Sequence, residues 1–522
     1  MSDAGSGIVL VGMPTTGKST VGRLVAERLG RPFIDTDELA ARRAGMPVPD
    51  YIRRHGEPAY RDEESRAVAE ACAVAGAVIS TGGGAAIDPV NRWALWHHGT
   101  VAWLDVGISQ LLRRLRADDV ARTTLEPYSA ERLTTILAER AAIYRAADLR
   151  LDAAGTPETV AGELVSSLGP LRGRRLLDAE VERHHPIGPR TARVVMGIDL
   201  GDVAPAGVAV VDRRLLTAAP ELVRSAAVST CLPIAAGERS KRIRSLERIL
   251  EWLAAERVER GTPLIAVGGG TIGDLAGTAA ALYARGLPLV HVPTTWLAQA
   301  DSAIGGKVAL DLSAAKNAVG AFWPPVAVVS DIAALRSLPT RLRRDGMAES
   351  IKSAIIGDPA LWRLLEERGR KALETDEPAR YAILERSARL KLAVCERDPF
   401  ETGERRTLNL GHTIGHALEI ESRYRLPHGA AVALGMRAIA AIGARRGANS
   451  ELAERLDSLL NGIGFKLRRS FDADAVRAAL LGDKKRRDGR QRWILPMEIG
   501  RVIEVDDLTD AELELGLKTI AA

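Results

Sequence analysis

Short apolar runs alternate with longer helical patterns over residues 8–165. The runs I-V-L-V, A-V-I-S-T and V-A-W-L-D occupy 8–11, 77–81 and 101–105. After the first run, apolar residues recur with the period of a helix until a glycine and a proline stop it, which predicts a helix over 19–29. This alternation is typical of a parallel sheet flanked by helices.

The pattern stops near residue 166, where Gly, Pro, Arg and His residues follow without periodicity, so we expect a linker with at most a short helix. A second α/β pattern follows, with apolar runs at 193–198, 208–212 and 264–267. After about residue 340, long helical patterns replace the strands. These changes predict an α/β domain, a linker, a second α/β domain and a helical domain, over 1–167, 168–190, 191–340 and 341–522.

Composition and charge narrow the classes of protein that fit. Hydrophobic residues make up 46% of the chain and charged residues 27%, which is ordinary for a globular protein. The net charge of +5 comes without a basic tail, so small anionic substrates fit better than nucleic acid. We find no signal sequence and no 18-residue apolar run, and therefore expect no membrane span and a cytoplasmic location. The three cysteines are widely spaced, so neither a disulfide framework nor a cysteine metal site is expected.

A glycine-rich motif follows the first apolar run. Gly12-x4-Gly17-Lys18-Ser19 lies between a predicted strand and a predicted helix, which is the context that a P-loop requires. Backbone N–H groups of such a loop bind nucleotide phosphates, the lysine adds positive charge, and the serine can ligate Mg²⁺. The motif predicts a nucleotide but not a reaction.

Four further motifs follow the P-loop in order: D-T-D, G-E-P-A-Y-R, G-G-G and E-R-A-A-I-Y, at 35–37, 56–61, 82–84 and 139–144. This ordered set resembles shikimate kinase over about residues 7–165. The resemblance implies ATP-dependent phosphorylation of shikimate, with Mg²⁺ held by Ser19 and Asp35. It assigns the ATP contacts to Gly12, Gly17, Lys18, Ser19, Thr20 and Arg122. It assigns the shikimate contacts to Asp37, Arg61, Gly83 and Arg140.

The chemistry of these residues agrees with that resemblance. Two arginines suit a carboxylate, and Asp37 suits a hydroxyl that it must orient or deprotonate, while Lys18 stabilises the transferred phosphoryl group. The family's lid sequence R-P-L-L is replaced by R-T-T-L at 122–125, and Tyr60 replaces the usual Phe. The altered lid leaves open the alternative that this half is an inactive nucleotide-binding module.

Three of the nine histidines, His412, His416 and His428, lie in one window, downstream of A-E-S-I-K with Glu349. Two neutral imidazoles and one carboxylate form a ligand set for catalytic zinc, which keeps one position open. His412 and His416 are four residues apart and share a helix face, so spacing alone favours them as the pair of ligands. Histidines packed without a metal are the structural alternative.

Gly268-x-Gly270-x-x-Gly273 follows a strand and precedes a helical pattern, but no acidic residue follows about 20 positions later to contact a ribose. V-P-T-T-W-L-A-Q-A-D-S-A-I-G-G-K, K-N-A-V-G-A-F and the L-N-L-G-H-T window resemble 3-dehydroquinate synthase over about residues 191–510. The two resemblances together imply an α/β protein: a P-loop kinase domain fused to a Rossmann-related NAD domain and an all-helical metal-binding domain.

The second resemblance also implies site residues. Zinc, or cobalt, would be bound by Glu349, His412 and His428. NAD would be contacted by Glu238, Lys241, Gly270, Asp274, Thr294, Thr295, Lys307 and Lys316. The substrate phosphate would be surrounded by Lys307, Asn317, Lys352, Asn409 and His416, with Asp301 nearby. The substrate carboxylate would face Lys391, Arg405 and either Lys484 or Lys485. Because the family is dimeric, Arg285 would reach the site from a partner subunit.

The implied reaction cyclises 3-deoxy-D-arabino-heptulosonate 7-phosphate to 3-dehydroquinate with loss of phosphate, and NAD is regenerated in each turnover. Its two anionic groups need separate cationic sites, and zinc can lower the pKa of the hydroxyl that is oxidised. Ala430 stands where the family has Glu, V-A-L-D-L follows G-G-K, and Trp323 replaces a His or Tyr. Two other enzymes stay open as alternatives: a related sugar-phosphate cyclase, or a metal-dependent polyol dehydrogenase.

Overall fold

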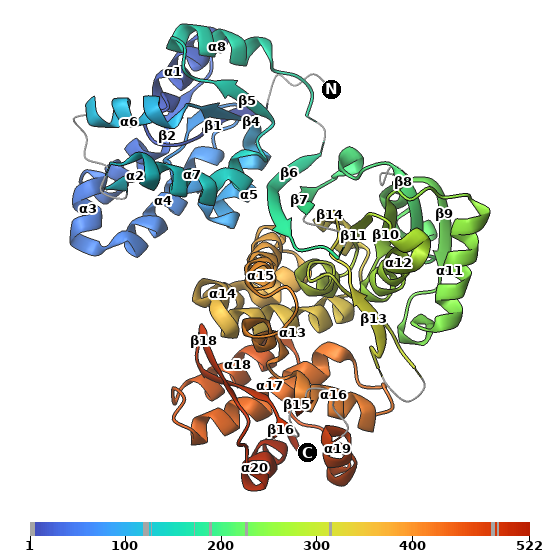
Figure 1. Ribbon diagram of the computed structural model, residues 1–522. Helices are drawn as coiled ribbons and strands as arrows, with labels where there is room; N and C mark the ends of the chain where they lie inside the picture. Colours follow the sequence, from blue (N-terminus) through green and yellow to red (C-terminus); the bar gives the residue numbers. More distant parts are fainter. Residues whose placement is uncertain are drawn as a thin grey trace. The chain divides into compact units, whose positions relative to one another are not determined.

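The computed structural model describes residues 6–117, 125–126, 128–171, 173–186, 190–224, 228–312, 316–481, 486–487 and 490–522. It contains two compact units, one formed by residues 1–180 with 193–200 and the other by 181–192 with 201–522 (Figure 1). The predicted site residues Arg122, Lys484 and Lys485 lie outside the described residues. None of the helices in the described part is long and apolar enough to cross a membrane.

Unit 1 is built on a parallel sheet in the order β2-β3-β1-β4-β5. Its strands are β1 Gly7–Val11, β2 Phe33–Asp35, β3 Val78–Ser80, β4 Gly99–Asp105 and β5 Leu149–Asp152. Its helices are α1 Lys18–Leu29, α2 Thr36–Ala44, α3 Val48–His55, α4 Glu57–Cys72, α5 Pro89–His98, α6 Ile108–Ala117, α7 Ala130–Tyr144 and α8 Pro157–Ser166. All residues of β1 are buried, as expected where helices cover both faces of a parallel sheet. The predicted parallel α/β domain is confirmed.

The segment predicted as a linker contains a strand. β6 (Arg174–Arg183) pairs with β7 (Arg190–Ile198), and residues of both strands are divided between the two units. The sequence R-R-L-L-D-A-E-V-E-R has no apolar run, and it forms a strand because ion pairs neutralise part of its charge. Asp178, for example, accepts hydrogen bonds from Arg193 at 2.8 and 2.7 Å. Pairing with distant residues therefore stabilises a strand whose own sequence does not predict one.

Unit 2 begins with α/β structure whose sheet includes the parallel run β14-β11-β10-β8-β9. These strands are β8 Gly207–Asp212, β9 Val228–Ile234, β10 Leu264–Gly268, β11 Leu289–Pro293 and β14 Ala327–Asp331. β12 and β13 form a separate hairpin, over Lys307–Leu310 and Val319–Phe322. The helices here are α9 Leu215–Ala218, α10 Pro220–Arg224, α11 Ile243–Ala255 and α12 Gly270–Leu282. A core of aliphatic side chains from β8, β10, α11 and α12 holds the sheet and helices together.

The rest of unit 2 is mainly helical, as predicted. Its helices are α13 Thr340–Gly357, α14 Pro359–Glu374, α15 Glu377–Arg397, α16 His412–Glu421, α17 His428–Arg445, α18 Leu452–Ile463, α19 Ala473–Leu481 and α20 Asp510–Ile520. It is not all-helical, however, because two short hairpins follow α19. They are β15 Arg486–Arg487 with β16 Arg490–Gln491, and β17 Trp493–Glu498 with β18 Arg501–Val505. β17 buries Trp493, Ile494 and Leu495, a run too short to stand out from the helical pattern.

Candidate functional site

The P-loop lies between β1 and α1, as its motif predicts. Gly17, at φ 94°, precedes α1, a backbone conformation that glycine adopts without strain. The Lys18 Nζ donates to the carbonyl oxygens of Gly12 and Met13 at 3.0 and 2.8 Å. Ser19 Oγ donates to Asp35 Oδ2 at 2.6 Å, so the hydroxyl and carboxylate expected at Mg²⁺ lie together. Thr20 is exposed in the first turn of α1.

The residues predicted to contact shikimate gather around the G-G-G loop at 82–84. A Cβ at Gly82 would collide with the Asp37 carboxylate, and one at Gly84 with the Arg61 guanidinium. Arg140 Nη1 donates to the Gly83 carbonyl oxygen at 2.6 Å. Glycines at 82 and 84 thus let Asp37 and Arg61 approach the backbone of this loop closely, and Arg140 binds the loop between them.

Two residues of this site were not singled out from the sequence. Glu64 is 2% exposed and accepts a hydrogen bond from Arg61 at 2.7 Å; burial raises its pKa, although Arg61 opposes the shift. Tyr144 donates from its hydroxyl to the Gly83 carbonyl oxygen at 3.3 Å. Tyr144 ends the E-R-A-A-I-Y motif, which was a signal for it, whereas Glu64 is one turn beyond Arg61 on α4 and outside any motif.

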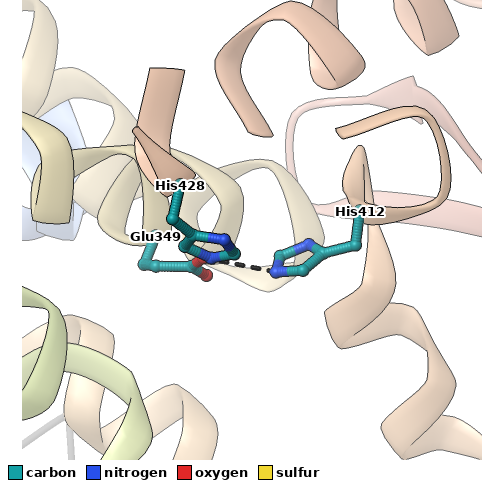
Figure 2. Close-up of side chains that lie close together, drawn as sticks. All are labelled: Glu349, His412 and His428. Carbon is teal, nitrogen blue, oxygen red and sulfur yellow. Dashed lines mark hydrogen bonds and ion pairs between the residues drawn. The ribbon is translucent and has the colours of Figure 1, made fainter. Parts of the chain in front are cut away.

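Glu349 of α13, His412 of α16 and His428 of α17 meet in one cluster (Figure 2). The Glu349 Oε1 lies 3.1 Å from Nε2 of His428 and 3.3 Å from Nε2 of His412. A tetrahedral zinc with bonds near 2.0–2.1 Å holds its ligand atoms about 3.3 Å apart, so this spacing fits a metal. The Nδ1 of His412 contacts the Leu410 carbonyl oxygen at 3.1 Å, which leaves Nε2 for the metal.

His416 lies beside this cluster and approaches a different acid, Glu419. Its Nε2 is 4.0 Å from Glu419 Oε2, while the Glu419 Oε1 is 3.4 Å from Nδ1 of His428. His416, Glu419 and His428 form a second group whose atoms could hold a metal. Lys316, however, already pairs with Glu419 at 3.4 Å. Glu419 was not assigned a role from the sequence, although it ends the quoted H-T-I-G-H-A-L-E motif.

Ala430 stands where the family has a glutamate, but His428 still has an acidic neighbour, Glu419, on its Nδ1 side. Glu419 supplies the carboxylate next to the outer nitrogen of His428, as often found behind metal-bound histidines. Burial would lower the pKa of His428, but its hydrogen bonds to Glu349 and Glu419 outweigh burial and raise that pKa to about 10. Burial lowers the pKa of His412 despite the nearby Glu349. At position 430 itself, the backbone N–H of Ala430 donates a hydrogen bond to Asp345 Oδ1 at 3.2 Å.

The residues predicted for NAD lie around the turn between β10 and α12. Gly270 begins α12, and Gly269, its N-cap, has no side-chain cap, so N–H groups of the first turn can meet a phosphate. A cavity lined by Gly270, Asp274 and Lys307 opens here. The Thr294 N–H donates to the Gly268 carbonyl oxygen at 3.0 Å. Thr295 Oγ1 accepts from the Ala298 N–H at 3.2 Å.

Ion pairs connect the other residues predicted for NAD. Lys241 lies 2.6 Å from Asp274 and donates to the Asn317 amide oxygen. Lys316 lies 2.9 Å from Glu238 and also reaches Glu419. Lys316 therefore connects the residues predicted for NAD with Glu419, which in turn contacts His428, one of the predicted metal ligands. Arg285 lies elsewhere, with an exposed side chain in the turn after α12.

The predicted substrate cations form two clusters with acids. Asp301, in the π-helical turn Ala298–Ser302, lies 2.7 Å from Lys391 and 3.6 Å from Lys352. Lys352 also lies 2.5 Å from Glu349, so this cluster touches the predicted metal ligands. Lys307 pairs with Glu401, a residue with no sequence signal, whose Oε1 accepts from Asn409 Nδ2 at 2.8 Å. Arg405 donates from Nη2 to the Gly305 carbonyl oxygen at 2.6 Å.

Comparisons with known proteins agree with this architecture. The family models described as 3-dehydroquinate synthase N-terminal and C-terminal match residues 231–345 and 346–486, and the shikimate kinase model matches residues 14–169. The 3-dehydroquinate synthase of Xanthomonas campestris is 42% identical over 340 residues, which are 62% of this chain and 90% of the relative. This chain belongs to the 3-dehydroquinate synthase family. Its shikimate kinase domain precedes the synthase part, and both domains are enzyme domains.

The 3-dehydroquinate synthase family has relatives with other names. The 2-epi-valiolone synthase of Actinosynnema mirum is 40% identical over 291 residues, 54% of this chain and 76% of the relative. The solved 2-epi-5-epi-valiolone synthase of Streptomyces hygroscopicus, with NAD⁺ and Zn²⁺ bound, matches with TM-score 0.60 and 28% identity over 65% of this chain and 98% of its own. Substrate choice within the 3-dehydroquinate synthase family therefore has to be argued from individual residues.

Proposed function

We propose that the chain is a bifunctional enzyme. Its synthase half cyclises 3-deoxy-D-arabino-heptulosonate 7-phosphate to 3-dehydroquinate and releases phosphate, and its kinase half phosphorylates shikimate at the 3-hydroxyl with ATP. The observation that carries the first activity is the contact of Lys352 with both Glu349 and Asp301, which joins a cation cluster to a metal-binding cluster.

The chain's own residues fit the cofactors that these activities need. Glu349, His412 and His428 would hold zinc or cobalt, and Ser19 with Asp35 would hold Mg²⁺ for ATP. Glu238, Lys241 and Lys316 would lie around NAD. When bound, zinc lowers the pKa of the hydroxyl that is oxidised, and NAD takes up and returns a hydride.

Separate groups of residues would bind the two anionic ends of the synthase substrate. Lys307, Lys352, Asn317, Asn409 and His416 would bind the phosphate, and His416 would carry a proton near it. Lys391 and Arg405 would bind the carboxylate, with Asp301 holding Lys391 in place. Because Lys307 is paired with Glu401, phosphate would compete with that carboxylate for the ammonium group.

In the kinase half, Asp37 would orient the hydroxyl that attacks ATP, and Arg61 and Arg140 would bind the shikimate carboxylate. Arg61 is paired with Glu57 and Glu64 at 2.6 and 2.7 Å, and would turn from these acids to the substrate. Lys18 would stabilise the charge on the transferred phosphoryl group.

A second candidate function is the cyclisation of a related sugar phosphate, since two similar proteins are named for valiolone-type products. Lys391 is 8% exposed and Arg405 3%. Two buried cations suit a substrate that brings a carboxylate. We therefore prefer the 3-dehydroquinate product.

We also propose that the enzyme is a homodimer through its synthase half, with Arg285 reaching a partner's site. The exposed position of Arg285 at the end of α12 supports this assignment. The mass of the purified chain in solution, measured by light scattering, tests it: a monomer at micromolar concentration would contradict the proposal.

The decisive experiment follows phosphate release and ADP formation separately, with each substrate. Lys18→Ala should lower ADP formation by about a thousandfold or more, because the P-loop cation stabilises transferred charge. It should leave phosphate release by the synthase half within about threefold, since the two sites are in different domains.

The two measurements test the kinase and the synthase activities independently, so either proposal can be contradicted without the other. No ADP formation by the intact enzyme would make the kinase half a binding module, and an unchanged rate in Lys18→Ala would refute the P-loop assignment. Phosphate release from a carboxylate-free sugar phosphate in place of the heptulosonate would favour the second candidate function.

A further inference from the structure

Arg183, the last residue of β6, is a buried arginine without a counter-charge. Its side chain is 6% exposed, and none of the carboxylates in the described part of the chain lies within 4.0 Å of its nitrogens. Its Nη2 donates to the Ile304 carbonyl oxygen at 3.2 Å, and its Nε has no hydrogen-bond partner. A guanidinium remains charged in proteins, and a buried, unpaired charge is unfavourable. This arginine therefore calls for a functional explanation.

Arg405 is a second buried arginine without an acidic partner among the described residues, and it lines the same cavity as Arg183. It is 3% exposed, and its two Nη atoms donate to the carbonyl oxygens of Pro399 and Gly305, each at 2.6 Å. No ion pair of Arg405 is found within the described residues. Arg183 and Arg405 thus bind the adjacent carbonyl groups of Ile304 and Gly305, and both line one small cavity.

The predicted substrate lysines differ from these arginines because each has an acid. Lys307 pairs with Glu401, and Lys352 and Lys391 both pair with Asp301. The acids that line the arginine cavity, Glu182 and Glu396, are exposed, and water screens exposed charges. Unbalanced positive charge in this part of the molecule is therefore concentrated on the two arginines.

We propose that Arg183 is a further specificity-determining residue, which together with Arg405 makes the synthase site select a substrate carrying a carboxylate. The inference rests on the synthase activity proposed above. Arg183 adds a second positive charge behind Arg405, where little water can screen it, and the substrate carboxylate supplies the missing negative charge. A ligand without that carboxylate leaves both guanidinium groups uncompensated, so the site discriminates against it.

The test measures a preference rather than an activity. It uses the full-length enzyme with NAD and zinc, and two unreactive substrate analogues that differ only in a carboxylate or a carboxamide. The ratio of their inhibition constants should strongly favour the carboxylate in the parent enzyme. In Arg183→Gln we expect this ratio to fall by about tenfold, with the carboxamide analogue binding as before. A purely structural role would weaken both analogues equally and leave the ratio unchanged.

Two further variants complete the test. Arg406→Gln is the matched control, because Arg406 adjoins Arg405 but is neutralised by Glu504 at 2.9 Å, and its ratio should not change. Cys395→Asp places a carboxylate beside Arg183, whose guanidinium lies against the Cys395 side chain, and should lower the ratio without removing the arginine. If Arg183→Gln does not fold, the ratio of inhibition constants in Cys395→Asp is the measurement that tests the inference.

An unchanged ratio in folded Arg183→Gln, or in Cys395→Asp where Arg183→Gln does not fold, would overturn the inference. That outcome is distinct from failure of the proposed function, in which the parent enzyme would release no phosphate from the heptulosonate.

Discussion

Three neighbouring histidines differ in whether their Nε2 atom lies against Glu349. His412 and His428 both direct Nε2 at Glu349, whereas His416 approaches Glu419. Spacing along one helix favours His412 with His416, and the family resemblance favours His412 with His428. The contacts in the folded chain agree with the resemblance.

His428→Ala should lose zinc and synthase activity together, because an open catalytic site has only three protein ligands. His416→Ala should keep close to one zinc per chain but turn over slowly, having lost a phosphate or proton-transfer contact. Metal analysis of the purified variants, alongside phosphate release, checks both. A metal-free His416→Ala with a metal-replete His428→Ala would assign zinc to the helical pair instead.

Glu419→Gln should weaken zinc binding by about 10–100-fold, the usual effect of losing an acid behind a metal-bound histidine. Zinc affinity is measured by competition with a chelator. Glu421→Gln is the control, since Glu421 lies on the same helix but pairs with Arg469 at 3.0 Å. Equal zinc affinity in the two variants would remove Glu419 from the metal site.

Among the elements, the loop between α15 and α16 depends on one carboxylate. Asp398 accepts hydrogen bonds from the N–H groups of Thr402, Gly403 and Arg405 at 2.9, 2.7 and 3.0 Å. Burial would raise the pKa of Asp398, but these N–H groups outweigh it and lower the pKa to about 2. The unfolded value is about 3.9. This contribution to stability is therefore complete above about pH 4 and is lost as the pH falls towards 2.

Asp398→Ala should raise the KM of the synthase substrate about tenfold or more, because Arg405 loses its backbone anchor, and should destabilise unit 2 by about 2 kcal/mol. Asp398→Asn keeps one acceptor oxygen and should fall between the parent and Ala. Steady-state kinetics and thermal melts check both effects. A wild-type KM in Asp398→Ala would show that the loop is held by other contacts.

At the scale of elements, the accuracy of sequence prediction depended on where each element finds its partners. β1, β4, β8 and β10 were predicted because strands buried on both faces are almost continuously apolar. β6 was not predicted because its charges are neutralised by residues distant in sequence, as Asp178 is by Arg193. β17 and β18 were missed because they are short and lie within a helical pattern.

On the scale of the whole molecule, the parallel sheet of the kinase half is complete by Asp152, and α8 ends at Ser166. Unit 1 nevertheless includes residues 174–180 and 193–200. Arg174 Nη1 donates to the Gly99 carbonyl oxygen at 2.7 Å, and Arg145 Nε donates to that of Asp178 at 3.1 Å. A cut near Gly173 would therefore leave residues 174–180 and 193–200 of unit 1 on the other fragment and remove these contacts.

A fragment of residues 1–172 should fold and phosphorylate shikimate by itself, but melt about 5 °C below a fragment of residues 1–200, which keeps the two hydrogen bonds. Calorimetry of both fragments and an ADP assay check this. An insoluble or inactive 1–172 fragment would mean that β6 is part of the kinase fold.

The sequence by itself determined the P-loop between β1 and α1 and the order of the α/β and helical parts along the chain. These features are local: a phosphate-binding loop needs its glycines, lysine and serine within eight positions, and buried strands need apolar runs. The tertiary structure decided which of the histidine and acidic side chains come together in space. Glu349, His412 and His428 come from three helices, and Glu401 and Arg183 contact residues far away in sequence, Lys307 and Ile304. Charge balance is a property of neighbours in space, so no spacing along the chain could have indicated it.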